Sequence, residues 1–97
     1  MIRHVVLFTW SPDADAERRA RTVEALRGLR RSVGGMTSLA VADDADLVDG
    51  NADTVLIAEF PDVEAFHRYA QDPVHLAVIA EHVRPILAAR SAIQHRV

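Results

Sequence analysis

The stretch IRHVVLFTW at residues 2–10 decides the fold, because almost every position in it is apolar or β-branched. Successive side chains of a strand point to opposite faces, so Val6 and Phe8 lie on one face and Val5 and Leu7 on the other. Both faces are therefore apolar, which predicts a strand in the middle of a sheet that is covered on both sides.

The other predicted elements can be placed outward from this strand. Residues 54–60, TVLIAEF, repeat the two-faced apolar pattern and predict a second central strand. Weaker strands are predicted at Ser38–Ala42 and Ser91–Val97. Helices are predicted at about Ala14–Ser32, from Asp62 to the residue before Pro73, and from Pro73 onward with an interruption at Pro85.

Aspartates stand where each helix should begin. Asp13 or Asp15 is placed to cap the first helix, Asp62 the second and Asp72 the third, since a carboxylate accepts hydrogen bonds from the free N–H groups of a first helical turn. Pro73 fits the first helical position, where a missing N–H has no cost. In the first helix the apolar stripe is expected to contain Ala16, Ala20, Val23, Leu26, Leu29 and Val33.

The order βαββαβ predicts an α+β, ferredoxin-like fold with a four-stranded antiparallel sheet, in which the first and third strands lie in the middle. Both helices of such a fold cover one face of the sheet. The other face would leave Val5, Leu7, Val55 and Ile57 in water. Exposed patches of large aliphatic side chains are rare on monomers, so we expect a homodimer that packs sheet to sheet, a dimeric α/β barrel.

Composition narrows the classes of function. The 97 residues predict one domain spanning residues 1–97. A formal charge of −3, with acidic and basic residues interspersed, predicts neither nucleic-acid nor membrane partners. All 11 basic residues are arginine and no cysteine occurs, which excludes Schiff-base and thiolate chemistry. No signal or membrane-spanning pattern appears, and we expect a soluble, cytoplasmic protein.

Three side chains that can exchange protons fall among residues predicted to be buried, namely His4, Tyr69 and His75. A neutral histidine is a suitable general base and a tyrosine hydroxyl a suitable hydrogen-bond donor, so their convergence would form a site. Each also has a structural interpretation. His75 would be a surface histidine beside its helix cap, Tyr69 a core aromatic, and His4 a buried residue with a satisfied hydrogen bond or an orienting group.

The chain resembles the stress-responsive A/B barrel (Dabb) domain family over essentially its whole length. The resemblance rests on the opening MIRHVVLF, the GMTSL turn at residues 35–39, the EFPDVEAF segment at residues 59–66, and the later positions Tyr69, Asp72-Pro73, His75 and Arg90. It implies a dimeric α+β barrel. The best understood type in that family is a plant polyketide cyclase that closes a ring by intramolecular aldol condensation without metal or cofactor.

What the resemblance implies for individual residues is specific. The base of that cyclase corresponds to His75, the assisting tyrosine to Tyr69, and the histidine of its first strand to His4. Near the C-terminus, where the family often has an aspartate, this sequence has Gln94. The implied reaction therefore lacks a second acidic orienting group.

These observations lead to three hypotheses of function. The first is an apolar pocket for a small carbonyl-bearing metabolite, possessing His75 as base and Tyr69 as hydrogen-bond donor and walled by Val6, Phe8, Val23, Leu26, Phe66 and Ile79. The second is a stress-response or ligand-binding protein that uses the same pocket without turnover. The third is a cofactor-free monooxygenase of the kind that shares this barrel, with Trp10 lining the cavity.

Other candidate sites are weaker. His67, His82 and His95 have charged neighbours and are expected at the surface. The acidic loop at residues 43–53 lacks the ligand spacing of an EF-hand and is expected to be solvated. No metal-ligand, phosphate-loop or dinucleotide-binding motif occurs, so we expect neither metal nor cofactor.

Overall fold

The computed structural model describes all residues 1–97 and confirms the ferredoxin-like α+β fold. The four strands form one antiparallel sheet in the order β2-β3-β1-β4, so the two most apolar strands are central, as predicted. The elements are β1 (Ile2–Trp10), α1 (Ala16–Ser32), β2 (Ser38–Asp43), β3 (Thr54–Phe60), α2 (Val63–Gln71), α3 (Pro73–Val78), a π-helical turn η1 (Ile79–Val83), a 3-10 turn η2 (Arg84–Ile86) and β4 (Leu87–Arg96).

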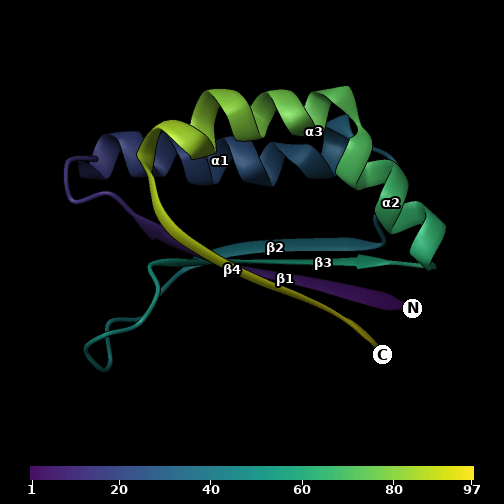
Figure 1. The fold of residues 1–97 in the computed structure, drawn as a ribbon, viewed down its shortest axis with the longest axis horizontal. Coiled ribbons are helices and arrows are strands. Elements are labelled where there is room, and N and C mark those ends of the chain that lie inside the picture. The colour runs from purple at the N-terminus through teal and green to yellow at the C-terminus, as the bar shows by residue number, and fades with distance from the viewer.

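All helices lie on one face of the sheet, and the opposite face is bare (Figure 1). The even-numbered side chains of β1 point toward the helices and are buried: Ile2, His4, Val6, Phe8 and Trp10. In β3 the alternate residues Thr54, Leu56, Ala58 and Phe60 do the same. Six of these side chains pack against α1, α2 and η1 in one apolar core: Val6, Phe8, Trp10, Leu56, Ala58 and Phe60.

The aspartate caps form as predicted, with Asp15 as the cap of α1. Its carboxylate accepts from the Arg18 N–H at 2.8 Å, while Asp62 and Asp72 accept from the N–H groups of Ala65 and Val74, also at 2.8 Å. The α1 stripe differs from the prediction, because Ala16 and Ala20 are exposed and Thr22 is buried. The small alanines do not drive burial, and α1 is oriented by Val23, Leu26, Leu29 and Val33.

Thr22 is buried because it secures the irregular turn η1. Pro85 has no N–H to donate to the Glu81 carbonyl, and that carbonyl instead accepts from the Arg18 guanidinium at 3.3 Å. The Thr22 hydroxyl donates a hydrogen bond to the His82 carbonyl oxygen at 3.0 Å. Side chains of α1 thus satisfy carbonyl groups that the regular α-helix would have paired.

The last strand begins four residues earlier than predicted, at Leu87 rather than Ser91. The segment Leu87-Ala-Ala-Arg has little intrinsic strand preference, but it pairs with the far end of β1, where Arg90 lies opposite Phe8. Pairing with a long central strand outweighs weak local propensity. As a result Arg90 belongs to the sheet, and its side chain lies on the same face as Phe8.

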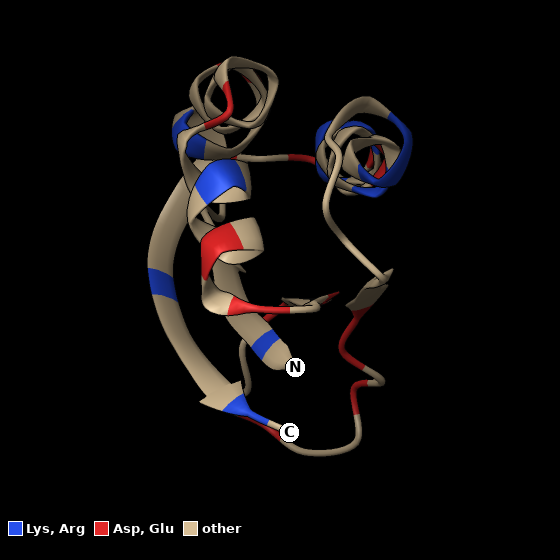
Figure 2. Ribbon diagram, turned by 90° about the vertical axis from the view of Figure 1, so that its right-hand side faces the viewer, with Lys and Arg blue, Asp and Glu red and all other residues tan.

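The bare face of the sheet is apolar at its centre, as the sequence predicted. Val5, Val55 and Ile57 are only partly covered, and Leu7 and Ile93 are 43% and 60% exposed. The face is bordered by the paired charges Arg3 and Glu59, at 3.1 Å. Acidic segments are concentrated in the connection between β2 and β3, whereas basic segments occur on α1 and β4 (Figure 2). None of the helices is both long and apolar enough to span a lipid bilayer.

Candidate functional site

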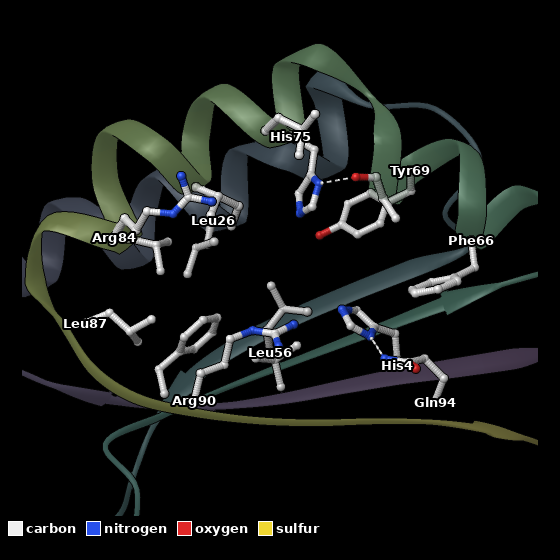
Figure 3. Close-up of a pocket in the computed structure, with 16 residues that line it drawn as sticks. His4, Leu26, Leu56, Phe66, Tyr69, His75, Arg84, Leu87, Arg90 and Gln94 are labelled. Carbon is white, nitrogen blue, oxygen red and sulfur yellow. Dashed lines mark hydrogen bonds between the residues drawn. The ribbon is translucent and has the colours of Figure 1, made fainter.

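A cavity of about 380 Å³ lies between the sheet and the helices, at the lower end of the size range of small-molecule sites. Its walls come from β1, α1, β3, α2, α3, η1, η2 and β4 (Figure 3). Most of the lining is apolar: Val6, Phe8, Leu26, Leu56, Phe66, Tyr69, Ala70, Leu76, Ile79, Val83 and Leu87. The polar lining residues are His4, His75, Arg84, Arg90 and Gln94.

Five of the six predicted wall residues do line this cavity, namely Val6, Phe8, Leu26, Phe66 and Ile79. Val23 does not, and its inclusion was wrong. It lies one turn before Leu26 on α1, and its buried side chain packs into the apolar core instead of bordering the open space. The stripe of an amphipathic helix identifies what faces inward, but not which members meet a void.

His75 projects from the first turn of α3 into the cavity. Its Nδ1 lies 3.3 Å from the carbonyl oxygen of Ala70. A carbonyl can only accept, so Nδ1 is the donor and Nε2 is the unprotonated nitrogen available to the cavity. Burial lowers the pKa of His75; the hydrogen bond to Ala70 and the Asp72 carboxylate oppose this effect, and Arg90 adds to it. The ring is therefore neutral at neutral pH, as a general base requires.

Tyr69 lies beside His75, with ring centroids 4.2 Å apart. Position 69 falls on the inner face of α2, which buries the ring almost completely, and its hydroxyl points into the cavity (Figure 3). Burial raises the pKa of Tyr69 to about 12, against the opposing charge of Arg90. The hydroxyl therefore keeps its proton and can donate a hydrogen bond.

His4 completes the group from the floor of the cavity, where β1 directs it toward the helices. Its ring centroid lies 6.2 Å from that of Tyr69 and 5.1 Å from that of Phe66. Gln94 lies directly opposite His4 in the β1–β4 pair, and its Nε2 is 2.9 Å from Nδ1 of His4. An amide nitrogen only donates, so Nδ1 accepts and Nε2 of His4 carries the proton.

The electrostatics of His4 follow from its position. Burial, with smaller contributions from Arg90 and His75, lowers the pKa of His4 to about 4. The contact with Gln94 fits the neutral ring, because an amide N–H pairs only with an unprotonated ring nitrogen. The aspartate that the family often has near the C-terminus would favour the charged form instead. The cavity thus combines two neutral histidines with one protonated tyrosine.

Two arginines in the cavity were not singled out as site residues from the sequence. Arg84 and Arg90 line it from opposite walls, η2 and β4 (Figure 3). Arg90 contributed only to the family resemblance, because a charged residue in a polar C-terminal segment looks like a surface residue. The alternation Arg90-x-Ala92-x-Gln94 was the available signal, since the last of these faces His4.

The remaining candidates lie outside the cavity. Trp10 is buried but does not line the cavity. Its Nε1 donates to the Thr54 hydroxyl at 2.9 Å, and its ring stacks on that of Phe8, with the ring centroids 5.0 Å apart. Its proposed place in the cavity lining, which the monooxygenase hypothesis implied, was therefore wrong. His67 and His95 are exposed, and His82 is half-buried. Nowhere do three His, Cys, Asp or Glu side chains come together in a group that could hold a metal ion.

Comparison with protein families gives a match over residues 2–96 to the stress responsive A/B barrel domain. A comparison with curated protein sequences gave no match. Among solved structures, a dimeric ferredoxin-like protein of unknown function from Thermobifida fusca is 29% identical, with a TM-score of 0.90 over 99% of this chain and 90% of that one.

Two further solved structures share the fold at lower identity. A Dabb family protein from Mesorhizobium loti is 22% identical, with a TM-score of 0.84 over 99% of this chain and 95% of that one. A hydroxynitrile lyase from Passiflora edulis is 16% identical, with a TM-score of 0.85 over 99% of this chain and 92% of that one. At these identities the similarity establishes the common fold alone.

Proposed function

The chain belongs to the stress-responsive A/B barrel domain family, and on that premise we propose that it binds a small, largely apolar metabolite containing a carbonyl group and removes a proton next to that carbonyl. One observation carries this proposal. His75, neutral and with Nε2 free, lies beside the ring of Tyr69, whose protonated hydroxyl points into the same apolar cavity. A base and a hydrogen-bond donor on one carbonyl compound are what enolisation needs.

The chemistry would proceed as follows. Nε2 of His75 takes a proton from the carbon beside the carbonyl, and the C–H electron pair moves into the new C=C bond. Negative charge develops on the carbonyl oxygen, and the Tyr69 hydroxyl donates a hydrogen bond to it. Attack of this enolate on a second carbonyl of the same molecule would form a C–C bond, with the proton returned from His75 to the new alkoxide. The low polarity of the walls strengthens each of these interactions.

The proposal includes a homodimer built on the bare face of the sheet. A second copy would cover Val5, Leu7, Val55, Ile57 and Ile93, which otherwise leave an apolar patch in water. The loop between β2 and β3 projects on the same side (Figure 1), and its tip exposes Leu47 and Val48 by 85% and 64%. The protein from Thermobifida fusca, which has the same fold, is described as dimeric.

A second candidate function is binding without turnover. It is favoured by the way in which His75 is held. Its Nδ1 meets a backbone carbonyl at a long 3.3 Å, and no carboxylate accepts a hydrogen bond from the ring to orient it, although the Asp72 carboxylate nearby favours its charged form. A base without such a partner is weaker. The same apolar walls would still hold a ligand.

Proton abstraction can be tested without knowing the natural substrate. 2-Acetylnaphthalene has slowly exchanging methyl protons next to its carbonyl, and NMR in D₂O measures their replacement by deuterium. We expect the protein to accelerate this exchange, and His75→Ala to reduce the acceleration by about 10²- to 10⁴-fold. Tyr69→Phe, which removes only the hydroxyl, should reduce it while leaving the affinity nearly unchanged. His67→Ala, on an exposed histidine of α2, is the matched control.

The results separate the two candidates. Binding of the ketone without accelerated exchange would support the binding protein and reject the enolising enzyme. Acceleration that survives in both variants would place the base elsewhere. The exchange rate should also fall as the pH drops below the lowered pKa of His75, because the imidazolium cannot accept a proton.

A further inference from the structure

Arg84 and Arg90 face the cavity without any anionic partner. The ion pairs of the protein involve Arg3, Arg21 and Arg27, and neither cavity arginine makes a hydrogen bond to a protein group. Six other arginines, by contrast, donate to carboxylates, hydroxyls or carbonyls: Arg3, Arg18, Arg19, Arg21, Arg27 and Arg30. Arg31, Arg68 and Arg96 also lack partners, but among the unpaired arginines only Arg84 and Arg90 line the cavity, where their exposed guanidinium groups are available for a ligand.

The fold fixes where these two guanidinium groups lie. Arg90 lies opposite Phe8 in the β1–β4 ladder, and the strand alternation puts it on the face that holds Gln94 and His4. Arg84 comes from η2, on the helical wall across the cavity. In Figure 3, Arg84 and Leu87 lie toward one end of the cavity and Phe66 toward the other, while the Arg90 side chain extends from β4 toward the middle, beside His4.

The charge in the cavity is consequently one-sided. No Asp or Glu is among its lining residues. His4 and His75 are neutral at neutral pH, and arginine stays charged. Arg90 adds to the lowering of the pKa of His4 and His75 and opposes the rise in the pKa of Tyr69, so its field reaches all three side chains. Apolar walls with two uncompensated positive charges suit an amphiphilic anion.

We propose that the ligand of this cavity is an organic carboxylate. Arg90, with help from Arg84, would hold its carboxylate, and its apolar body would extend toward Tyr69 and His75. This inference rests on the proposed function and specifies its substrate class as an oxo acid. A guanidinium group matches a carboxylate with two parallel hydrogen bonds. With its carboxylate at the guanidinium groups, an oxo acid of suitable length would place its carbonyl near the Tyr69 hydroxyl.

A phosphate ester fits the same cavity less well. Phosphate sites generally surround the anion with hydroxyls and backbone N–H groups as well as cations. The lining here has no Ser, Thr or Lys, and its strand backbone groups are engaged in the sheet. Removing a doubly charged group from water into apolar walls also costs more than removing a single charge.

The test uses a pair of probes with the same shape and different charge, 2-naphthoate and 2-naphthamide. Isothermal titration calorimetry gives both dissociation constants, and NMR shifts of the His75 and Tyr69 rings verify that each probe occupies the cavity. We expect naphthoate to bind about tenfold more tightly than naphthamide, with the advantage shrinking as salt is added. Arg90→Gln should reduce the ratio to near one.

Arg96→Gln is the matched control, since it makes the same substitution on the same strand at a residue that does not line the cavity. It should keep the preference for naphthoate. Equal binding of both probes by the parent protein would overturn the carboxylate inference and leave the proposed function standing. A preference that survives in both Arg90→Gln and Arg84→Gln would also overturn it. Failure of both probes to enter the cavity would overturn the inference and the proposed function together.

Discussion

The two faces of strand β1 differ in burial although they share one backbone. Its even-numbered residues, such as His4 and Phe8, are buried beneath the helices and border the cavity. Its odd-numbered residues, such as Val5 and Leu7, lie on the bare face of the sheet. Both sets are mainly apolar, yet only the first encloses groups that can transfer protons.

The difference teaches what an apolar surface signifies in this fold. Where helices cover the sheet incompletely, the remaining space is a cavity, and burial there shifts the pKa values of His4, Tyr69 and His75. Where nothing covers the sheet, the apolar patch favours association. Each of the following predictions acts on one face and should spare the other.

The largest effect is expected on the bare face. Leu7→Asp would place an unpaired carboxylate in the proposed interface of each subunit, which costs several kcal/mol, so the dimer should dissociate. Sedimentation velocity should show a monomer with the cavity intact. Ala20→Asp, on the exposed side of α1, introduces the same charge and should leave a dimer. A stable monomer for the unaltered protein would contradict the proposed interface on the bare face.

The next effect concerns acid stability and belongs to the cavity face. The pKa of His4 is lowered from 6.5 to about 4. Between these two pH values the unfolded chain binds a proton at His4, whereas the folded chain does not. Stability should be full above pH 6.5 and fall by an amount on the order of 3 kcal/mol as the pH drops toward 4. Urea denaturation at several pH values measures it, and His4→Asn should reduce the slope.

A smaller effect is expected at the partner of that histidine. Gln94→Asp replaces a donor to Nδ1 of His4 with a negatively charged acceptor, which favours the imidazolium and should raise the pKa of His4 by a unit or more, or about 1.4 kcal/mol. NMR titration of the ring protons follows this directly. An unchanged pKa in the variant would mean that burial and the charge of Arg90, and not the residue at position 94, control the pKa of His4.

The smallest effect is expected at the border of the bare face. Arg3 and Glu59 form a partly exposed cross-strand pair at 3.1 Å, and such pairs contribute little. Arg3→Ala should lower the free energy of unfolding by about 0.5 kcal/mol and leave the cavity unaffected. A loss several times larger in urea denaturation would show that this pair, and not the apolar centre, holds the face together.

Much of the fold could be predicted because local and global signals agree. The β-branched runs at residues 2–10 and 54–60 mark the central strands, and aspartates mark each helix start. The errors occurred where tertiary structure outweighs local preference. Leu87 and the two alanines that follow it become a strand through pairing with β1, and Thr22 is buried because it meets a carbonyl of η1.

The candidate site was partly predictable for the same reason. His4, Tyr69 and His75 could be selected by residue type and expected burial, and the structure brings them together. Arg84 could not, because a void depends on side chains from eight elements and leaves no periodic mark in the sequence. For Arg90 the one signal was its alternation with Gln94 along the last strand. Val23 shows the converse, since helix periodicity does not distinguish a residue that borders a cavity from one packed a turn away.

The alternation in β1 has an evolutionary consequence. Substitutions at its even positions would alter what the cavity accepts, whereas those at its odd positions would alter what the subunit pairs with. After gene duplication, two copies could therefore diverge in ligand preference while keeping a common association surface. Such descendants would still assemble with one another, and a mixed dimer would hold two different cavities in one particle.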